Sequence, residues 1–236
     1  MSIQVTNLTK IYGSQRAVDG ITFSLKPGEI VGFLGPNGAG KSTTMKMLTG
    51  YLNPSSGTAT VADFDVTEQP MPARRAIGYL PEHNPLYLDM YVREFLLFSG
   101  KLYGMGGTTL KAKVEEMIAL CGLEVEKKKK IGQLSKGYRQ RVGLAQSFLH
   151  DPSVLILDEP TTGLDPNQIQ EIRELIRTAG HNKTILFSTH IMQEVETLCD
   201  RVIIINKGCV VRDSSLEELR KTGQSLEEIF RSLTIS

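Results

Sequence analysis

The sequence predicts an α/β fold built on a mostly parallel sheet with flanking helices. Two short runs, residues 154–157 and 184–188, are almost continuously apolar, which is typical of strands buried on both faces. A glycine-rich loop at residues 35–40 joins an apolar strand to a helix-favouring stretch. Residues 82–150 instead carry apolar side chains at helical spacing. We therefore expect one α/β core with a helical subdomain inserted into it.

The individual elements follow from residue type and spacing. Glycine and proline bound the short apolar runs that predict strands. Apolar side chains three or four positions apart predict helices, as at Phe95, Phe98 and Leu102. The expected strands are residues 3–8, 21–25, 29–34, 77–80, 154–157, 184–188, 201–206 and 209–212. The expected helices are residues 41–48, 92–103, 110–121, 138–149, 168–177, 216–221 and 226–233.

The composition excludes several classes of protein. The chain has 236 residues, of which 40% are hydrophobic, so disordered, collagen-like and small disulfide-stapled chains are excluded. The 27 basic and 26 acidic residues leave a net charge of +1, which argues against a protein that coats nucleic acid. Three cysteines without CxxC spacing fit a reducing compartment. Since neither an export signal nor a membrane-length apolar run is visible, we expect a soluble, cytosolic chain.

The glycine-rich loop matches the phosphate-binding pattern GxxxxGK[ST]. Its residues are Gly35, Pro36, Asn37, Gly38, Ala39, Gly40, Lys41 and Ser42. Glycines let the backbone aim its N–H groups at an anion, and the following helix adds unpaired donors and its dipole. Lys41 supplies a charge for the β and γ phosphates, and the Ser42 hydroxyl can coordinate Mg²⁺. The loop therefore predicts binding of a nucleoside triphosphate; the alternative is a glycine-rich turn that matches by chance.

Two neighbouring carboxylates end the apolar strand at residues 154–157. Asp158 stands where it can hold Mg²⁺, directly or through water, and Glu159 is then free to polarise the attacking water. The alternative is a strand that simply enters a polar loop. Together with the phosphate loop upstream, the acidic pair favours hydrolysis of the nucleotide.

With these and the following motifs, the chain resembles an ATP-binding cassette (ABC) ATPase. Residues 134–140, Leu-Ser-Lys-Gly-Tyr-Arg-Gln, are similar to the family's signature sequence, and residues 162–165, Thr-Gly-Leu-Asp, to its D-loop. His190 follows a strand as the family's switch histidine does, and Tyr12 corresponds to an aromatic that stacks on adenine. Alternatively, Ser135 only caps a helix, and Tyr12 and His190 are structural. These motifs follow the family's order, and the resemblance extends over essentially the whole chain.

The resemblance implies a fold, cofactors and a set of site residues. The fold would be a P-loop NTPase core with an N-terminal antiparallel β region and an inserted helical subdomain, and the cofactors ATP and Mg²⁺. The implied catalytic residues are Glu159, His190 and Lys41. The implied ATP-binding residues are Tyr12, Val18, Gly35, Pro36, Asn37, Gly38, Ala39, Gly40, Lys41, Ser42 and Thr43. The implied metal ligands are Ser42, Asp158 and Glu82.

The resemblance also implies that two cassettes pair head-to-tail. Each ATP would lie between Lys41 of one subunit and the signature residues Ser135, Lys136 and Gly137 of the other, with Asp165 in the D-loop. Two positions depart from the family pattern. Lys136 replaces the usual first glycine of the signature and Tyr138 its glutamine, yet the serine and second glycine remain. Glu82 stands where the family has glutamine, and its carboxylate can accept but not donate hydrogen bonds.

These departures and the C-terminal residues 225–230 resemble the bacterial exporter-type subunits that serve separately encoded membrane proteins for drug, polysaccharide and gliding-motility systems. The expected partners are a second copy or a homologous cassette and a transmembrane permease, without nucleic acid. The expected location is the cytoplasm, on the inner face of the cell membrane. Residues 85–91 concentrate apolar and aromatic side chains, including Tyr87, that would receive the permease or else pack internally. The lysine run 127–130 is expected to be a solvated loop, the alternative being attraction to lipid head groups.

Other functions lack their sequence features. A soluble ABC ATPase acting on ribosomes or DNA generally needs two cassettes or a long coiled-coil insertion, and a regulatory GTPase needs an Asn-Lys-x-Asp base reader, which residues 206–209 lack. We therefore expect a single ABC ATPase domain over residues 1–236. Its nucleotide-binding core would take about residues 1–81 and 151–213, its helical signature subdomain about 82–150, and its C-terminal helices about 214–236.

Overall fold

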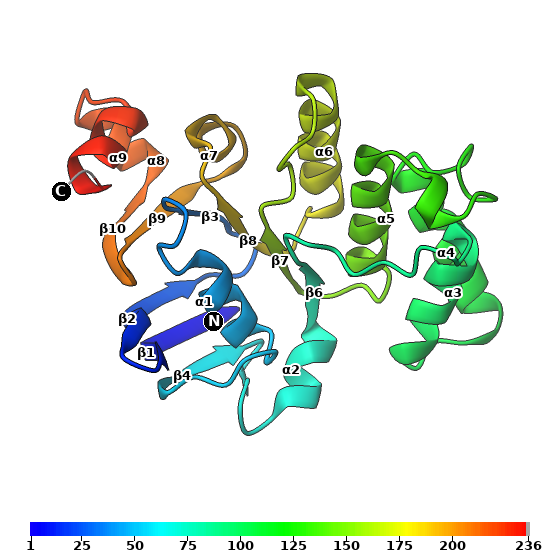
Figure 1. Ribbon diagram of the computed structural model, residues 1–236, viewed down its shortest axis with the longest axis horizontal. Helices are drawn as coiled ribbons and strands as arrows, with labels where there is room; N and C mark the ends of the chain where they lie inside the picture. The colour runs from blue at the N-terminus through cyan, green and yellow to red at the C-terminus, as the bar shows by residue number, and fades with distance from the viewer. Residues whose placement is uncertain (235–236) are drawn as a thin grey trace.

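A computed structural model of the chain describes residues 1–234 (Figure 1). The last two residues of the expected C-terminal region lie outside this range. Two sheets form the core. The first is antiparallel, has the strand order β2-β1-β4-β5, and consists of β1 (Ile3–Tyr12), β2 (Gln15–Leu25), β4 (Ser56–Val61) and β5 (Phe64–Asp65).

The second sheet has six strands in the order β10-β9-β3-β8-β7-β6, all parallel except the edge strand β10. Its members are β3 (Ile30–Leu34), β6 (Ile77–Leu80), β7 (Val154–Asp158), β8 (Thr184–Thr189), β9 (Arg201–Asn206) and β10 (Cys209–Ser215). The predicted mostly parallel sheet and N-terminal antiparallel region are therefore confirmed.

The helices divide into those that cover the second sheet and those that stand apart beside it. α1 (Lys41–Leu48) lies on the same side of the second sheet as the antiparallel sheet, and α6 (Pro166–Ala179) and α7 (Met192–Leu198) lie on the other side (Figure 1). Between β6 and β7 the chain forms a separate helical lobe of α3 (Val92–Leu102), α4 (Gly107–Leu120), a 3₁₀ turn (Ile131–Gln133) and α5 (Lys136–Phe148). The remaining helices are α2 (Pro70–Ala76), α8 (Leu216–Lys221) and α9 (Leu226–Thr234). None of the helices in residues 1–234 is long and apolar enough to cross a membrane.

The apolar run of β7 is explained by the two hydrophobic clusters that meet at the second sheet. Val154 and Ile156 pack into the cluster shared with α1 and the antiparallel sheet. Leu155 and Leu157 pack into the cluster shared with α6, α7 and the helical lobe. Because both faces of the sheet are covered, every position of this strand before Asp158 is apolar.

Several elements differ from the sequence expectation. β1 and β2 extend well beyond residues 3–8 and 21–25, because the tip of this hairpin, residues 11–16, is exposed and is held by backbone pairing rather than by burial. β4, β5, α2 and α7 were not expected at all. α2 contains two prolines within its first three residues, and α7 is only two turns long, so neither shows a sustained helical period.

The parallel pairing brings three strand ends to one edge of the sheet. Leu34 at the end of β3 pairs with Thr189 of β8, and Asp158 at the end of β7 pairs with Ser188 of β8. The loops that follow these strands therefore start next to one another. In open α/β sheets, ligands bind at the carboxyl ends of the strands.

Candidate nucleotide-hydrolysis site

The loop between β3 and α1 needs glycine at two positions for lack of space. A Cβ atom at Gly35 would lie 2.5 Å from the Ile205 carbonyl oxygen, and one at Gly40 would lie 2.6 Å from the Ala17 carbonyl oxygen. Gly40 also has a φ of 107°, a conformation that L-residues avoid. The loop is thus packed tightly against the chain behind it. On its outer side, Asn37 and Gly38 are exposed.

The first turn of α1 leaves backbone donors for a ligand. Its N-cap is Gly40, which has no side chain to accept hydrogen bonds from the first N–H groups. The first turn contains no acidic residue, and Thr43 is half-buried there. An uncapped helix N-terminus with its positive dipole end is suited to an anion such as phosphate.

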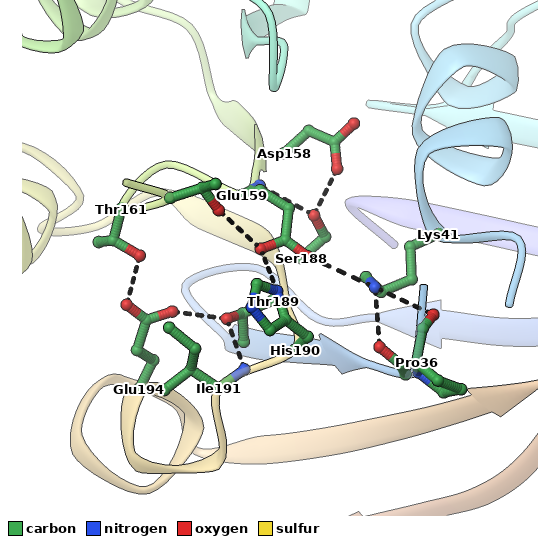
Figure 2. Close-up of polar contacts among 12 residues, drawn as sticks. Pro36, Lys41, Asp158, Glu159, Thr161, Ser188, Thr189, His190, Ile191 and Glu194 are labelled. Carbon is green, nitrogen blue, oxygen red and sulfur yellow. Dashed lines mark hydrogen bonds and ion pairs between the residues drawn. The ribbon is translucent and has the colours of Figure 1, made fainter. Parts of the chain in front are cut away.

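The Lys41 ammonium is buried at the centre of the site. It donates hydrogen bonds to the carbonyl oxygens of Gly35 (2.7 Å) and Pro36 (3.3 Å). Its Nζ also lies 3.4 Å from Glu159 Oε1. The lysine is therefore held against both the loop and the carboxylate that follows β7 (Figure 2).

Glu159 joins the ends of two strands. Its Oε2 atom lies 2.8 Å from His190 Nδ1 and accepts a hydrogen bond of 3.1 Å from the Thr162 hydroxyl. Its backbone N–H donates to the Ser188 hydroxyl at 3.0 Å, and its φ is 50°. A left-handed conformation in a residue with a side chain is sparsely populated and clusters at functional sites. His190 is exposed on its other side, with 44% of its side chain accessible.

Asp158 is almost fully buried and is satisfied by two hydroxyls. Its Oδ1 atom accepts hydrogen bonds from Ser188 (2.5 Å) and Ser42 (3.3 Å). Burial raises the pKa of this carboxyl above its ordinary value, and the nearby Glu82 and Glu159 carboxylates raise it further, against the two hydrogen bonds that lower it. The surroundings therefore disfavour the negative charge of Asp158, and a cation beside it would stabilise that charge.

Glu82 faces the same space as Ser42 and Asp158. The three residues line a cavity of about 600 Å³ that continues to Tyr87, Phe98 and Leu102 in the helical lobe. Burial also raises the pKa of the Tyr79 hydroxyl, which lines this cavity as well. A hydroxyl and carboxylates are the oxygen donors that Mg²⁺ prefers, and Mg²⁺ is usually bound by one or two carboxylates together with substrate phosphates and waters. The residues present therefore fit this metal.

Tyr12 and Val18 have different environments. Tyr12 ends β1 with 49% of its surface exposed, and the Lys10 ammonium lies 5.5 Å from the centre of its ring. Val18 is fully buried, and its Cγ2 atom would lie 3.3 Å from a Cβ at Gly40. The tyrosine can therefore offer a ring face to a ligand, whereas the valine supports the loop from behind.

The signature residues start α5 and contact the segment after Glu159. The Ser135 hydroxyl accepts from the Tyr138 N–H at 3.4 Å, and a Cβ at Gly137 would lie 2.9 Å from the Gln168 side chain. Lys136 fills the space beside Gly163. Within residues 1–234, no hydrogen bond or ion pair joins these residues to the loop at 35–42. Asp165 caps α6 by accepting from the Gln168 N–H at 3.0 Å.

The sequence reasoning missed several contributors. Ser188 links Asp158 to the backbone of Glu159, and the Thr162 hydroxyl binds the Glu159 carboxylate. Gln140 donates a hydrogen bond of 2.7 Å to the Pro160 carbonyl and so connects α5 to the same loop. Glu194, in α7, is completely buried behind the site. The sequence signal for Ser188 was a polar residue at the end of an apolar run. The sequence around Glu194 carried no comparable signal.

Comparison with known proteins identifies the family. The ABC transporter family model matches residues 18–162. The chain is 40% identical over 228 residues to the bacitracin transport ATP-binding protein BcrA of Bacillus licheniformis, which covers 96% of this chain and 74% of BcrA. It is 41% identical over 221 residues to the ABC transporter ATP-binding protein NatA of Bacillus subtilis, which covers 92% of this chain and 90% of NatA.

Solved structures agree with the fold described above. A structure described as the ATP-binding subunit of an ABC transporter superposes with a TM-score of 0.88 at 30% identity and covers 99% of both chains. A dimeric post-hydrolysis state of the ATP-binding cassette MJ0796 bound to ADP and Pi gives a TM-score of 0.83 at 25% identity, covering 91% of this chain and 98% of that one. The resemblance read from the ordered motifs is thereby confirmed, and the chain belongs to the ABC transporter family as an ATP-binding subunit that hydrolyses ATP to energise transport.

Proposed function

We propose that Glu159 orients and deprotonates the water that attacks ATP. The observation that carries this proposal is the position of its carboxylate, with Lys41 Nζ 3.4 Å from one oxygen and His190 Nδ1 2.8 Å from the other. The lysine would neutralise charge on the β and γ phosphates, and the half-exposed histidine would contact the γ phosphate. General-base assistance is typically worth about 10²–10⁴ in rate.

The phosphates would bind to the loop and to the first turn of α1. The uncapped N-terminus and the tightly packed Gly35 and Gly40 support this role. Tyr12 would stack on the adenine ring, a contact worth about 1–3 kcal/mol per base. Pro36, Asn37, Gly38, Ala39 and Thr43 would complete the binding loop. Val18 would contribute by fixing Gly40, since its own side chain is buried.

We infer that Mg²⁺ is held by the Ser42 hydroxyl and by Asp158, with Glu82 at the same cavity. When bound, the metal would neutralise charge on the phosphate oxygens. The chain's own residues would hold the metal-binding oxygens in position. Ser188, for example, fixes the Asp158 carboxylate by a 2.5 Å hydrogen bond. Glu82 would act as an acceptor, through water or directly, in place of the family's glutamine.

We propose further that two copies of the chain, or one copy and a homologous cassette, pair head-to-tail. Ser135, Lys136 and Gly137 would then face the nucleotide bound by the other subunit, with Asp165 beside the contact. Two observations support this arrangement: within residues 1–234 the start of α5 makes no hydrogen bond or ion pair to the chain's own loop at 35–42, and the related MJ0796 cassette has a dimeric structure. Each ATP would join the two subunits until it is hydrolysed.

The partner in the membrane would be a separately encoded permease, and the transporter an exporter. Relatives include BcrA and a Nod factor export ATP-binding protein I of Burkholderia orbicola, 42% identical over 207 residues. The cavity that joins Asp158 to Tyr87 would receive a cytoplasmic segment of the permease and place the subunit on the inner face of the membrane, without nucleic acid. In this proposal the helical lobe, about residues 82–150, transmits the movement of the nucleotide core.

Replacing Glu159 with Gln tests the hydrolytic mechanism. The glutamine amide keeps the shape of the glutamate side chain, and its oxygen can still accept a hydrogen bond from Lys41. It cannot take a proton from water. We expect the variant to bind ATP with little change in affinity and to lose turnover by about 10²–10⁴-fold. Equilibrium nucleotide binding and phosphate release would be measured on the same preparation. Hydrolysis at the rate of the unsubstituted protein would reject the assignment.

A further inference from the structure

The buried carboxylate of Glu194 contacts two loops of the site at once. Its Oε1 accepts a hydrogen bond from the Thr161 hydroxyl, and its Oε2 accepts one of 2.6 Å from the Thr189 hydroxyl. Both threonines are buried, and Glu194 itself has no exposed surface. Figure 2 shows the carboxylate between the two hydroxyls, behind the residues that face the loop at 35–41. Within residues 1–234, its carboxylate makes no hydrogen bond or ion pair to a residue proposed to contact ATP or water.

The two hydroxyls lie next to the proposed catalytic groups along the chain. Thr161 comes two residues after Glu159, and Thr189 comes immediately before His190. The Thr189 hydroxyl also accepts from the Ile191 N–H at 3.0 Å, so it fixes the backbone on both sides of the histidine. Glu194 therefore links the two catalytic loops from outside, in addition to the direct contacts that His190 and Ser188 make with residues 158–159.

A carboxylate is suited to this position for physical reasons. It offers two acceptor oxygens at a fixed spacing in one rigid plane, and hydrogen bonds to a charged acceptor are about twice as strong as neutral ones. The Arg173 guanidinium of α6, 3.7 Å from Oε1, supplies the opposite charge. A buried carboxylate that loses a donor pays the full cost of that unsatisfied group, so the two threonines are held firmly.

We propose that Glu194 is a positioning residue that sets the distance between Glu159 and His190. This inference rests on the proposed roles of those two side chains. Without the tie, the two loops would still be joined by the bond from the Glu159 N–H to Ser188 and by the contact of His190 with Glu159. The segments at Thr161 and Thr189, however, would lose their shared anchor. Because a misplacement of about 1 Å can cost about 10²-fold in rate, a loosened pair would slow hydrolysis. Binding of ATP to the loop and α1 would be unaffected.

Isosteric substitutions at the two threonines test this role. Thr161→Val and Thr189→Val remove the hydroxyl and keep the shape, whereas Thr161→Ser and Thr189→Ser keep the hydroxyl. We expect each valine variant to lower kcat by about tenfold to a hundredfold with an unchanged KM for ATP. The serine variants should recover most of the rate. Thermal unfolding of each variant would separate loss of folded protein from loss of rate.

The double variant Thr161→Val/Thr189→Val provides a readout that a purely structural role would not give. If Glu194 ties the loops together, breaking either contact already removes its link between them, and the double variant should be hardly slower than a single one. Multiplied effects, serine variants as slow as the valine variants, or valine variants with full kcat would overturn the inference. Should Thr189→Val fail to fold, Thr161→Val carries the test, because the Thr161 hydroxyl bonds to no group but Glu194 in the described part of the chain.

The outcome for Glu159→Gln keeps the two proposals apart. If that variant hydrolyses ATP normally, the proposed function fails, whatever the threonine variants do. If Glu159→Gln is inactive and the valine variants have full kcat, only the role of Glu194 is rejected.

Discussion

The Lys41 ammonium and the Glu159 carboxylate form a buried ion pair, with 6% and 7% of their side chains exposed and 3.4 Å between Nζ and Oε1. The lysine also donates to two loop carbonyls. The two opposite charges therefore stabilise each other inside the protein.

Lys41→Met should destabilise the chain by leaving Glu159 without its cation. Removing one partner of a buried pair typically costs about 3–5 kcal/mol. Adding Glu159→Gln to the variant removes the stranded charge, so Lys41→Met/Glu159→Gln should unfold at a higher temperature than Lys41→Met alone. Thermal unfolding without nucleotide measures both. A double variant that is less stable than Lys41→Met would contradict the proposed balance of charge.

Asp158→Asn should stabilise the nucleotide-free protein at neutral pH while abolishing Mg²⁺-dependent hydrolysis. Folding raises the pKa of Asp158, so the folded state prefers its neutral form. The resulting stability is present below the unfolded pKa of about 4 and is lost as the pH rises through the folded pKa. An asparagine is neutral throughout and still accepts the Ser188 hydrogen bond.

The expected gain is therefore present above the folded pKa of Asp158 and disappears as the pH falls toward about 4. Each kcal/mol should raise Tm by about 2–4 °C in a chain of this size. Thermal unfolding in a chelating buffer over this pH range gives the measurement. An equal Tm for Asp158→Asn and the unsubstituted protein at neutral pH would mean that the buried charge costs nothing.

The substitution Ser135→Asp distinguishes two roles of Ser135, the capping of α5 and a contact to the nucleotide of a second subunit. Aspartate caps helices as well as serine does, so the monomer should keep its stability. Facing a triphosphate across a dimer interface, the added negative charge should be repelled. In a Glu159→Gln background saturated with ATP, we expect Glu159→Gln to dimerise and Glu159→Gln/Ser135→Asp to remain monomeric by analytical ultracentrifugation. Dimerisation of both would limit Ser135 to its capping role.

Tyr87→Glu should uncouple transport from hydrolysis. Tyr87 has 55% of its surface exposed and packs edge-on against Phe95 and Phe98 at ring distances of 6.0 and 5.7 Å. A charge there would oppose docking of an apolar segment without touching Asp158 or Glu159. ATPase activity of the isolated subunit should persist while transport by the assembled complex falls. Met71→Glu, at an equally exposed apolar position on α2 (57%) outside the cavity, is the matched control.

Much of the fold and the core of the site were predictable because the responsible signals are local in sequence. The four apolar residues of β7 indicate burial on both faces. The glycines and the lysine of the loop before α1 stand within one short segment, so the phosphate-binding pattern can be recognised from that segment alone. The elements that were missed depend on distant partners. β4 forms because it pairs with β1, and its exposed Ser-Gly-Thr start gives no local sign of a strand.

The same limit applies to the site. That Asp158 and Ser42 share a hydrogen bond, and that His190 reaches Glu159, depends on β3, β8 and β7 being neighbours in the sheet. Strand order of this kind is set by how the whole chain packs rather than by any one segment. Glu194 was invisible for a related reason: an acidic residue on a short helix is usually solvated, and its burial arises only where the two loops and α6 meet.

The turn between β9 and β10 supports the phosphate-binding loop from the far end of the chain. The Gly208 N–H donates to the Ala39 carbonyl at 3.0 Å, and the Gly208 carbonyl accepts from the Asp19 N–H at 2.9 Å. Binding of ATP to the loop should therefore depend on an intact β9–β10 hairpin. Occupancy by ATP should shield this hairpin from limited proteolysis, and cleavage within it should release nucleotide even though every residue that holds the phosphates is still covalently intact.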